Sequence, residues 1–261
     1  MTRENLEDYL FPALMLIIAV LAWEAFVRID HVPSFELPAP SEVIVTLIKD
    51  WRTLGASLLV TLSTTFEALF AAIFGGVVLA LIFHLWRPLE RAFFPFAVVM
   101  QVTPVISIAP LLLVYMSSGA AVLVCAFLVA FFPILSNTAL GLASADHNLL
   151  DLFELYGASP WQQLRLLRMP AALPYFLGGL RIGGGLALVG AIVAEIAAGS
   201  AGSGSGLAYR IVESGFRLEI PRMFAALFLI SITGILIFLF FTGLSWLLLH
   251  RWHDSMRARE R

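Results

Sequence analysis

Long uncharged stretches dominate the chain. No charged side chain occurs from Ala92 to Ala145, from Met223 to Leu249, or from Leu10 to Trp23. A helix needs about 20 apolar residues to cross the bilayer core, so the longest stretch has room for two spans. Because lipid offers backbone groups no hydrogen-bonding partner, continuous apolar runs predict α-helices. A membrane barrel would instead alternate apolar and polar positions.

These runs predict an all-α integral membrane protein with six transmembrane helices, built as one membrane domain of residues 1–261. Before the second span, Ser41 is expected to cap a short interfacial helix that ends near Trp51. The third predicted span contains three prolines. The predicted spans cover about residues 10–27, 58–85, 93–115, 120–140, 173–198 and 224–249.

Composition supports the same class. Hydrophobic residues make up 60% of the chain and charged residues 13%, and the mean hydropathy is +0.93. A soluble domain needs more charge to cover its surface. The net charge of −2 leaves no broad basic face for nucleic acid. Cys125 is the only cysteine and lies in an apolar run, while His250 and His253 are better explained as headgroup-level residues than as ligands, so no metal site is expected.

An even number of spans places both termini on the same side of the membrane. Lys and Arg are more frequent in the segments on that side, including the C-terminal tail and the turn that carries Arg87 and Arg91. Cytoplasmic loops carry the excess of positive charge. Both termini are therefore expected in the cytoplasm, in the inner membrane of a bacterial cell.

The connector between the fourth and fifth spans, residues 146–170, has the pattern of a helical hairpin. A first short helix ends at Gly157, a residue suited to the left-handed position that follows a helix. Ser159 then predicts an N-cap, with Pro160 at the first helical position and Gln162 completing a capping box. The connector thus predicts two short, well-defined helices on the cytoplasmic side.

The second helix of this hairpin carries an apolar stripe. Trp161 and Leu164 share one side, Arg165 lies beside them, and Pro170 is expected to end the helix. A membrane protein has no obvious internal need for such an anchor in the cytoplasm. The stripe therefore indicates docking into a groove of another protein.

At this connector the sequence resembles the coupling-loop motif of binding-protein-dependent ABC importer permeases of the type I fold, E-A-A, three residues, Gly, nine residues, I-x-L-P. Gly157 and Pro170 keep the offset of the motif, Leu167 stands for its Ile, and residues 158–162 match its usual continuation. The sequence departs from the motif at Asp151-Leu152-Phe153, in place of E-A-A, and at Met169, in place of the last Leu.

Three further segments are similar to the nitrate/sulfonate/taurine branch of these permeases. They are residues 37–42 with the sequence LPAPSE, residues 179–181 with GLR, and residues 193–196 with VAEI before a Gly/Ser loop. The resemblance implies a permease that pairs with a second permease copy, two cytoplasmic ATPase subunits and a periplasmic or lipid-anchored substrate-binding protein. ATP and Mg would be bound by the ATPase partner, with no cofactor in this chain.

Independently of the resemblance, this chain has no phosphate-binding loop of its own. Such a loop needs Gly-Lys-Ser/Thr, and the only lysine, Lys49, is followed by Asp50. Energy for transport must therefore come from a partner, and the chain is expected not to be an enzyme. The residues predicted to dock the ATPase are Asp151, Glu154, Gly157, Ala158, Ser159, Trp161, Leu164 and Arg165.

Polar groups inside the predicted spans are candidates for a substrate pathway. Glu195 and Glu67 are acids at membrane depth, where a charge faces a bundle interior or an aqueous cavity. For Glu195, a gate and a structural hydrogen-bond acceptor between helices remain equal alternatives. Glycines of the fifth span, residues 178, 179 and 183–185, predict close helix packing. The other candidate pathway residues are Met100, Gln101, Thr103, Pro104, Ser136 and Asn137.

Three classes of function fit a polytopic membrane protein. A transporter subunit is favoured. A membrane-embedded enzyme would need paired acids or a nucleophile–base pair at bilayer depth, and a channel would show a repeated filter or a ring of charges. Neither pattern is present in the sequence. The resembling branch handles small anions and vitamin precursors, so the substrate stays open.

Overall fold

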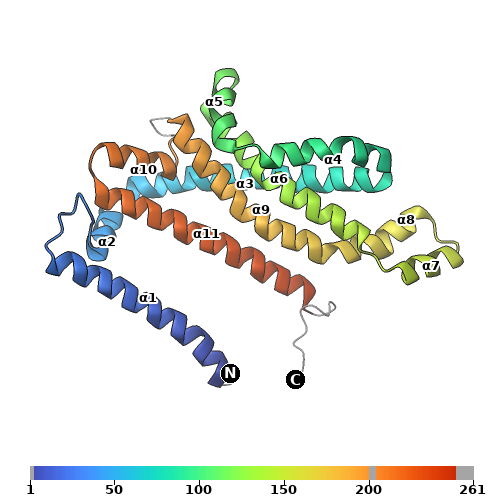
Figure 1. The fold of residues 1–261 in the computed structure, drawn as a ribbon, viewed down its shortest axis with the longest axis horizontal. Coiled ribbons are helices and arrows are strands. Elements are labelled where there is room, and N and C mark those ends of the chain that lie inside the picture. Colours follow the sequence, from blue (N-terminus) through green and yellow to red (C-terminus); the bar gives the residue numbers. More distant parts are fainter. Residues whose placement is uncertain (1–2, 200–203, 251–261) are drawn as a thin grey trace.

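The computed structural model describes residues 3–199 and 204–250, and these residues form helices joined by short connectors (Figure 1). The predicted all-α class is confirmed. The helices are α1 (Arg3–Ile29), α2 (Pro40–Lys49), α3 (Trp51–Leu85), α4 (Arg87–Val102), α5 (Val105–Tyr115), α6 (Ser118–Ala143), α7 (His147–Leu155), α8 (Pro160–Gln163), α9 (Met169–Ala198), α10 (Leu207–Phe216) and α11 (Ile220–Leu249).

Five segments of the described chain are long and apolar enough to cross a membrane. The bent pair α4–α5 is the candidate for a sixth crossing, which agrees with the six predicted spans. The helices extend beyond the predicted limits because helical geometry continues into the polar ends. The five segments are Leu10–Ile29, Trp51–Leu85, Ser118–Ala143, Pro160–Ala198 and Ile220–Leu249.

The centre of the fold is α9, which packs along α6 and α3. A side chain added at Gly190 would approach Ala126 of α6 to 2.9 Å, and one at Gly179 would approach the Cβ of Asn137 to 2.8 Å. Only glycine permits this approach, so the predicted close packing is confirmed for Gly179, and Gly190 is a further close contact that was not predicted. Gly178 and Gly185 have open space instead, and lie on a face of α9 without a neighbour.

The third predicted span, residues 93–115, is not one helix. It divides at Thr103 and Pro104 into α4 and α5, whose axes differ by 99°. Thr103 is extended, with φ −73° and ψ 125°. The cause is Pro104, which has no N–H for the helical ladder and disfavours the helical conformation of the residue before it.

The start of α2 also differs from the prediction. Its N-cap is Ala39, with Pro40 at the first helical positions, so Ser41 lies inside the helix. Proline fixes the backbone angle that a helix start needs, which moves the cap forward. The hydroxyl of Ser41 donates to Glu24 Oε1 at 2.8 Å and its N–H donates to Glu24 Oε2 at 3.0 Å. These bonds tie α1 to α2.

Pro170 does not end the second helix of the hairpin. A π-helical turn, Leu164–Arg168, joins α8 directly to α9, and Pro170 is accommodated at the start of α9. In a π turn each N–H bonds to the carbonyl five residues back. This shift in hydrogen bonding just before Pro170 lets the helix pass the residue that has no N–H. The hairpin is therefore one end of the long central segment Pro160–Ala198.

Away from its junction with α2, α1 stands apart from the other helices (Figure 1). Only 6% of its apolar window is buried within this chain. Near that junction, Trp23 packs against Phe224 of α11 with ring centroids 5.8 Å apart. The rest of α1 has its apolar surface available to lipid or to another protein.

Candidate coupling hairpin and translocation pathway

The hairpin is shaped by local hydrogen bonds at both of its helix ends. Asp146 caps α7 by accepting the N–H of Asn148 at 2.7 Å. At the other end, Gly157 has φ +67°, and Ala158 N donates to Phe153 O at 2.9 Å. This is the left-handed C-terminal geometry that the glycine predicted.

The predicted capping box at the start of α8 is confirmed. Ser159 N donates to Gln162 Oε1 at 2.7 Å, and Gln162 N donates to Ser159 Oγ at 3.3 Å. Pro160 occupies the first helical position. Two backbone donors that would otherwise lack partners are satisfied within four residues, so the start of α8 is stabilised by its own residues.

The tip of the hairpin exposes large side chains. Trp161 is 64% exposed and Tyr156 is 83% exposed. The predicted docking residues Asp151, Glu154 and Arg165 are also exposed, and none has an ion-pair partner within the part of the chain described above. An exposed aromatic anchor with unpaired charges around it has the composition of a protein-binding surface.

Leu164 is placed differently from its prediction as a docking residue. It is only 3% exposed and packs in a core with Phe83, Leu135 and Ala172. Arg168 Nη1 also donates weakly to Leu142 O, at 3.4 Å. Leu164 therefore fastens the hairpin to α3 and α6 and offers no surface to a partner.

Four predicted pathway residues come together at the break between α4 and α5. Met100, Gln101, Thr103 and Pro104 line a cavity of about 380 Å³. Its other walls come from α4, α5, α6 and α9, namely Val102, Val105, Leu128, Val129, Phe132, Pro133 and Leu186. None of the lining side chains is ionisable. A non-helical backbone at this depth is stable where it is buried or lines an aqueous cavity.

Ser136 and Asn137 do not join that cavity. They line a separate one of about 390 Å³ between α4 and α6, together with Glu90. Asn137 Nδ2 donates to Pro133 O at 2.8 Å, so its amide is used inside α6. The structure thus brings together four of the predicted pathway residues and places these two elsewhere.

Glu195 is buried in a contact between three helices. Its Oε1 accepts the Thr61 hydroxyl at 2.8 Å, and its Oε2 accepts Ala208 N at 3.1 Å. Thr61 Oγ1 in turn accepts Leu207 N at 2.9 Å, so α3 and α9 together hold the start of α10. Glu195 does not line the α4–α5 cavity. In this structure the carboxylate of Glu195 acts as a hydrogen-bond acceptor between helices, and its role as a gate stays a prediction. Glu67 is exposed on α3.

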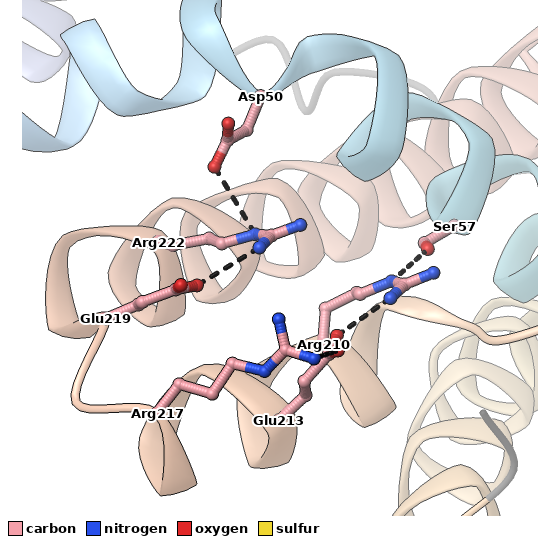
Figure 2. Close-up of polar contacts among 7 residues, drawn as sticks. All are labelled: Asp50, Ser57, Arg210, Glu213, Arg217, Glu219 and Arg222. Atoms are coloured by element: carbon pink, nitrogen blue, oxygen red, sulfur yellow. Dashed lines mark hydrogen bonds and ion pairs between the residues drawn. The ribbon is translucent and has the colours of Figure 1, made fainter. Parts of the chain in front are cut away.

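A cluster of ion pairs at the opposite end of the molecule was missed by sequence reasoning (Figure 2). Arg210 Nη1 lies 2.7 Å from Glu213 Oε2, and Arg217 Nη2 lies 2.9 Å from Glu213 Oε1. The hydrogen bond from Arg210 holds the pKa of Glu213 below its ordinary value, with further help from the nearby arginine charges. The spacing of these charges along α10 was the available signal.

The same cluster fixes the turn between α10 and α11. Arg222 lies 3.3 Å from Asp50 and 3.1 Å from Glu219, measured between the nearest nitrogen and oxygen atoms (Figure 2). The turn itself is apolar and exposed: Phe216 is 87% exposed, and Leu218 has a left-handed conformation with φ +59°. A strained, exposed apolar turn on a rigid ionic base is a candidate recognition surface.

The fold and these sites define a class: a polytopic membrane protein with a broken span beside a cavity and a capped helical hairpin with an exposed tip at one end. The family description "binding-protein-dependent transport system inner membrane component" matches residues 72–252, which include the hairpin, the cavity and the α10 tip. The match covers more than half of the sequence. This chain belongs to that family, the permeases of ABC importers.

Individual relatives are similar over nearly the whole length. The chain is 32% identical to a probable ABC transporter permease protein of Haemophilus influenzae, over 92% of this chain and 95% of that protein. It is 34% identical to the riboflavin transport system permease protein RibX of Chloroflexus aurantiacus, over 96% and 94%. It is also 34% identical to the formylaminopyrimidine transport permease protein ThiX of Halalkalibacterium halodurans, over 86% and 89%.

A solved structure supports the same fold. The crystal structure of an amino acid ABC transporter with histidines aligns with a TM-score of 0.63 over 78% of this chain and 96% of that one. Sequence identity is 18%, so the likeness concerns the fold alone. The family match and the relatives together confirm, at the level of the family, the resemblance found in the coupling-loop motif.

Proposed function

We propose that this chain docks a cytoplasmic ATPase through residues 149–168 and passes motion from it into the membrane helices. The observation that carries the proposal is the hairpin. Trp161 is exposed on its capped turn, and Leu164 packs in the core and holds the hairpin in place. Because α8 continues through the π turn into α9, a push on the hairpin acts directly on the central helix. Two ATPase subunits, which bind ATP and Mg, would serve a dimer.

The open face of α9 supports a second permease copy as the partner inside the membrane. Gly178 and Gly185 have no neighbour there, and Ile182 and Val189 are exposed beside them. Small residues on a membrane helix permit close approach of another helix. A homodimer pairing these faces would bury the central helix of each copy.

Arg181 gives a second reason for pairing. It is exposed in the middle of α9, with its guanidinium 5.7 Å from the centre of the Phe238 ring. A charge at the centre of a membrane helix costs about 2.5–3.5 kcal/mol when it faces lipid. The face that carries Arg181 is therefore better suited to a protein partner or to a water-filled pathway.

The cavity at the α4–α5 break is the proposed route for the solute. It offers Gln101 and Thr103 as polar groups, with Phe132 and Met100 as broad apolar walls. This lining suits an uncharged heteroaromatic molecule better than a sulfonate. Two relatives at 34% identity are described as permeases for riboflavin and formylaminopyrimidine. We infer uptake of a solute of that chemical class.

The extracytoplasmic partner would be a substrate-binding protein that meets the α10–α11 turn. Phe216 and Leu218 offer an apolar contact there, and the ion pairs beneath keep it in one position. In this orientation the hairpin and both termini are cytoplasmic. The membrane would be the bacterial inner membrane.

Gly157 provides the test of coupling. Its φ is +67° and no atom lies within 4 Å of an added Cβ, so Gly157→Val strains the backbone without a clash. The strain is about 1–2 kcal/mol and falls on the turn between α7 and α8. The complex, captured from native membranes by a tag on the permease, should lose most of its ATP-dependent uptake of riboflavin in proteoliposomes, together with ATPase stimulation.

Gly119→Val is the matched control, because Gly119 also has open space but lies within α6 with no left-handed backbone. It should leave uptake within about twofold of wild type. Unchanged coupling in Gly157→Val would contradict the mechanical role of the hairpin. Wild-type preparations that never contain an ATPase would instead favour a channel or a membrane-embedded enzyme.

A further inference from the structure

A third cavity lies at the end of the molecule that carries the hairpin, away from the α4–α5 break. Its volume is about 290 Å³. The end of α3, the start of α4, the end of α6, α7 and the π turn all contribute to its walls. Figure 1 shows the α3–α4 turn at the same end of the molecule as α7 and α8. The charged and imidazole side chains in its lining are His84, Arg87, Glu90, His147 and Arg168.

The cavity has an excess of positive charge. Arg87 and Arg168 are two guanidinium groups, and Glu90 is the single carboxylate, so the balance is positive even with both histidines neutral. No ion pair among the residues that the structure describes includes either arginine. The one hydrogen bond of Arg168 is a long contact of 3.4 Å to a backbone carbonyl. Most guanidinium donors are therefore available to a ligand.

We propose that this cavity binds an oxyanion of the phosphate type. Guanidinium groups present paired N–H donors that match the geometry of phosphate oxygens, and neutral imidazole adds a further donor. The cavity volume accommodates one phosphate group. Two sources share this chemistry: free inorganic phosphate in the cytoplasm, and the headgroup of an anionic lipid at the bilayer surface, where basic pockets between helices bind such headgroups.

The position of the cavity gives the anion a structural consequence. Arg87 begins α4, whereas Arg168 ends the π turn at the root of the docking hairpin. An anion held by both would link two segments that no ion pair joins within the described residues. Binding is therefore expected to stabilise the hairpin against the ends of α3 and α4.

The test uses the purified full chain in nanodiscs and follows its thermal unfolding in two arms. In the first, phosphatidylcholine discs receive sodium phosphate, compared with sodium chloride at equal ionic strength. In the second, phosphatidylglycerol replaces part of the phosphatidylcholine without added phosphate. A rise in melting temperature in the first arm identifies free phosphate as a ligand, and a rise only in the second identifies the lipid headgroup.

Arg87→Gln and Arg168→Gln should each lower the affinity for the anion, read from the shift in melting temperature, by about tenfold or more. This is the loss expected for one charged hydrogen-bonding group. Arg91→Gln is the matched control: it lies on α4 one turn beyond Arg87 but outside the cavity, and should respond as wild type. Arg168→Lys keeps the charge and should retain part of the response, and a single size-exclusion peak verifies folding. No shift in either arm, or equal losses in Arg91→Gln and the cavity variants, would overturn the proposal.

Discussion

Trp161 and Leu164 are three residues apart, yet the structure gives them opposite surroundings. Trp161 is 64% exposed at the tip of the hairpin, and Leu164 is 3% exposed in the core beneath it. Truncating each to alanine should therefore separate docking from stability. Trp161→Ala should weaken ATPase binding and leave the isolated permease stable, whereas Leu164→Ala should do the reverse.

The magnitudes follow from burial. Removing a fully buried leucine side chain costs about 2–5 kcal/mol, which lowers the melting temperature of a chain of this size by roughly 5–15 °C. Trp161→Ala removes a mostly exposed side chain, so the stability of the isolated permease should change by less than about 0.5 kcal/mol. An aromatic hot spot contributes 2 kcal/mol or more to an interface, so ATPase affinity should fall by about 30-fold or more.

Both quantities are measured on the same preparations. Thermal unfolding in detergent reports the stability of the isolated permease, and ATPase retained on an immobilised permease reports docking. A melting temperature that falls in Trp161→Ala with normal ATPase retention would show that the tryptophan packs within its own chain. Equal loss of ATPase in both variants at temperatures where both stay folded would refute the separate roles of the two side chains.

Three other changes test the orientation, the ionic cluster and the helix packing. Phe216→Cys should react with an impermeant thiol reagent from outside intact cells and Tyr156→Cys only after the cytoplasmic face is opened; the reverse pattern would contradict the proposed topology. The ion pairs of Glu213 depress its pKa below 4.5, so they stabilise the fold above pH 4.5, and this stability is lost as the pH falls through the depressed pKa. Glu213→Gln should therefore flatten the decline in melting temperature below pH 4.5. An unchanged decline would show that other groups cause it. Gly190→Val should destabilise the permease by about 1–3 kcal/mol or more in thermal unfolding because its Cβ would meet Ala126 at 2.9 Å, and wild-type stability would show that α6 and α9 can separate there.

The number of membrane helices and the local structure of the hairpin were predictable because both depend on neighbouring residues. Apolar length alone defines a span, since the bilayer imposes the same requirement on every segment. The capping box of Ser159 and the left-handed Gly157 involve residues at most five apart in the chain. Short-range stereochemistry of this kind is readable without knowing the tertiary structure.

Two errors arose where tertiary packing overrides the local pattern. Pro170 was expected to end a helix. The π turn before it shifts the hydrogen bonds of the helix, so the N–H that Pro170 lacks is not needed and the helix continues into α9. Leu164 was expected on the exposed stripe of Trp161, but it packs in the core against Phe83 and Leu135, which come from helices far away in the sequence. A helical period groups side chains on one face, but it does not show which face meets the rest of the fold.

Glu195 illustrates how structure separates the polar groups inside the membrane. Its partner Thr61 is 134 residues away in the sequence, so no local pattern distinguished a structural acceptor from a pathway residue. The fold satisfies Glu195 internally, but it leaves Glu67 and Arg181 exposed at the depth of the spans. Exposed charge at that depth is costly against lipid and tolerable against water or another protein. Glu67 and Arg181 are exposed in the single chain. We therefore expect the second copy of the permease, or the solute pathway, to lie against the surfaces that carry them.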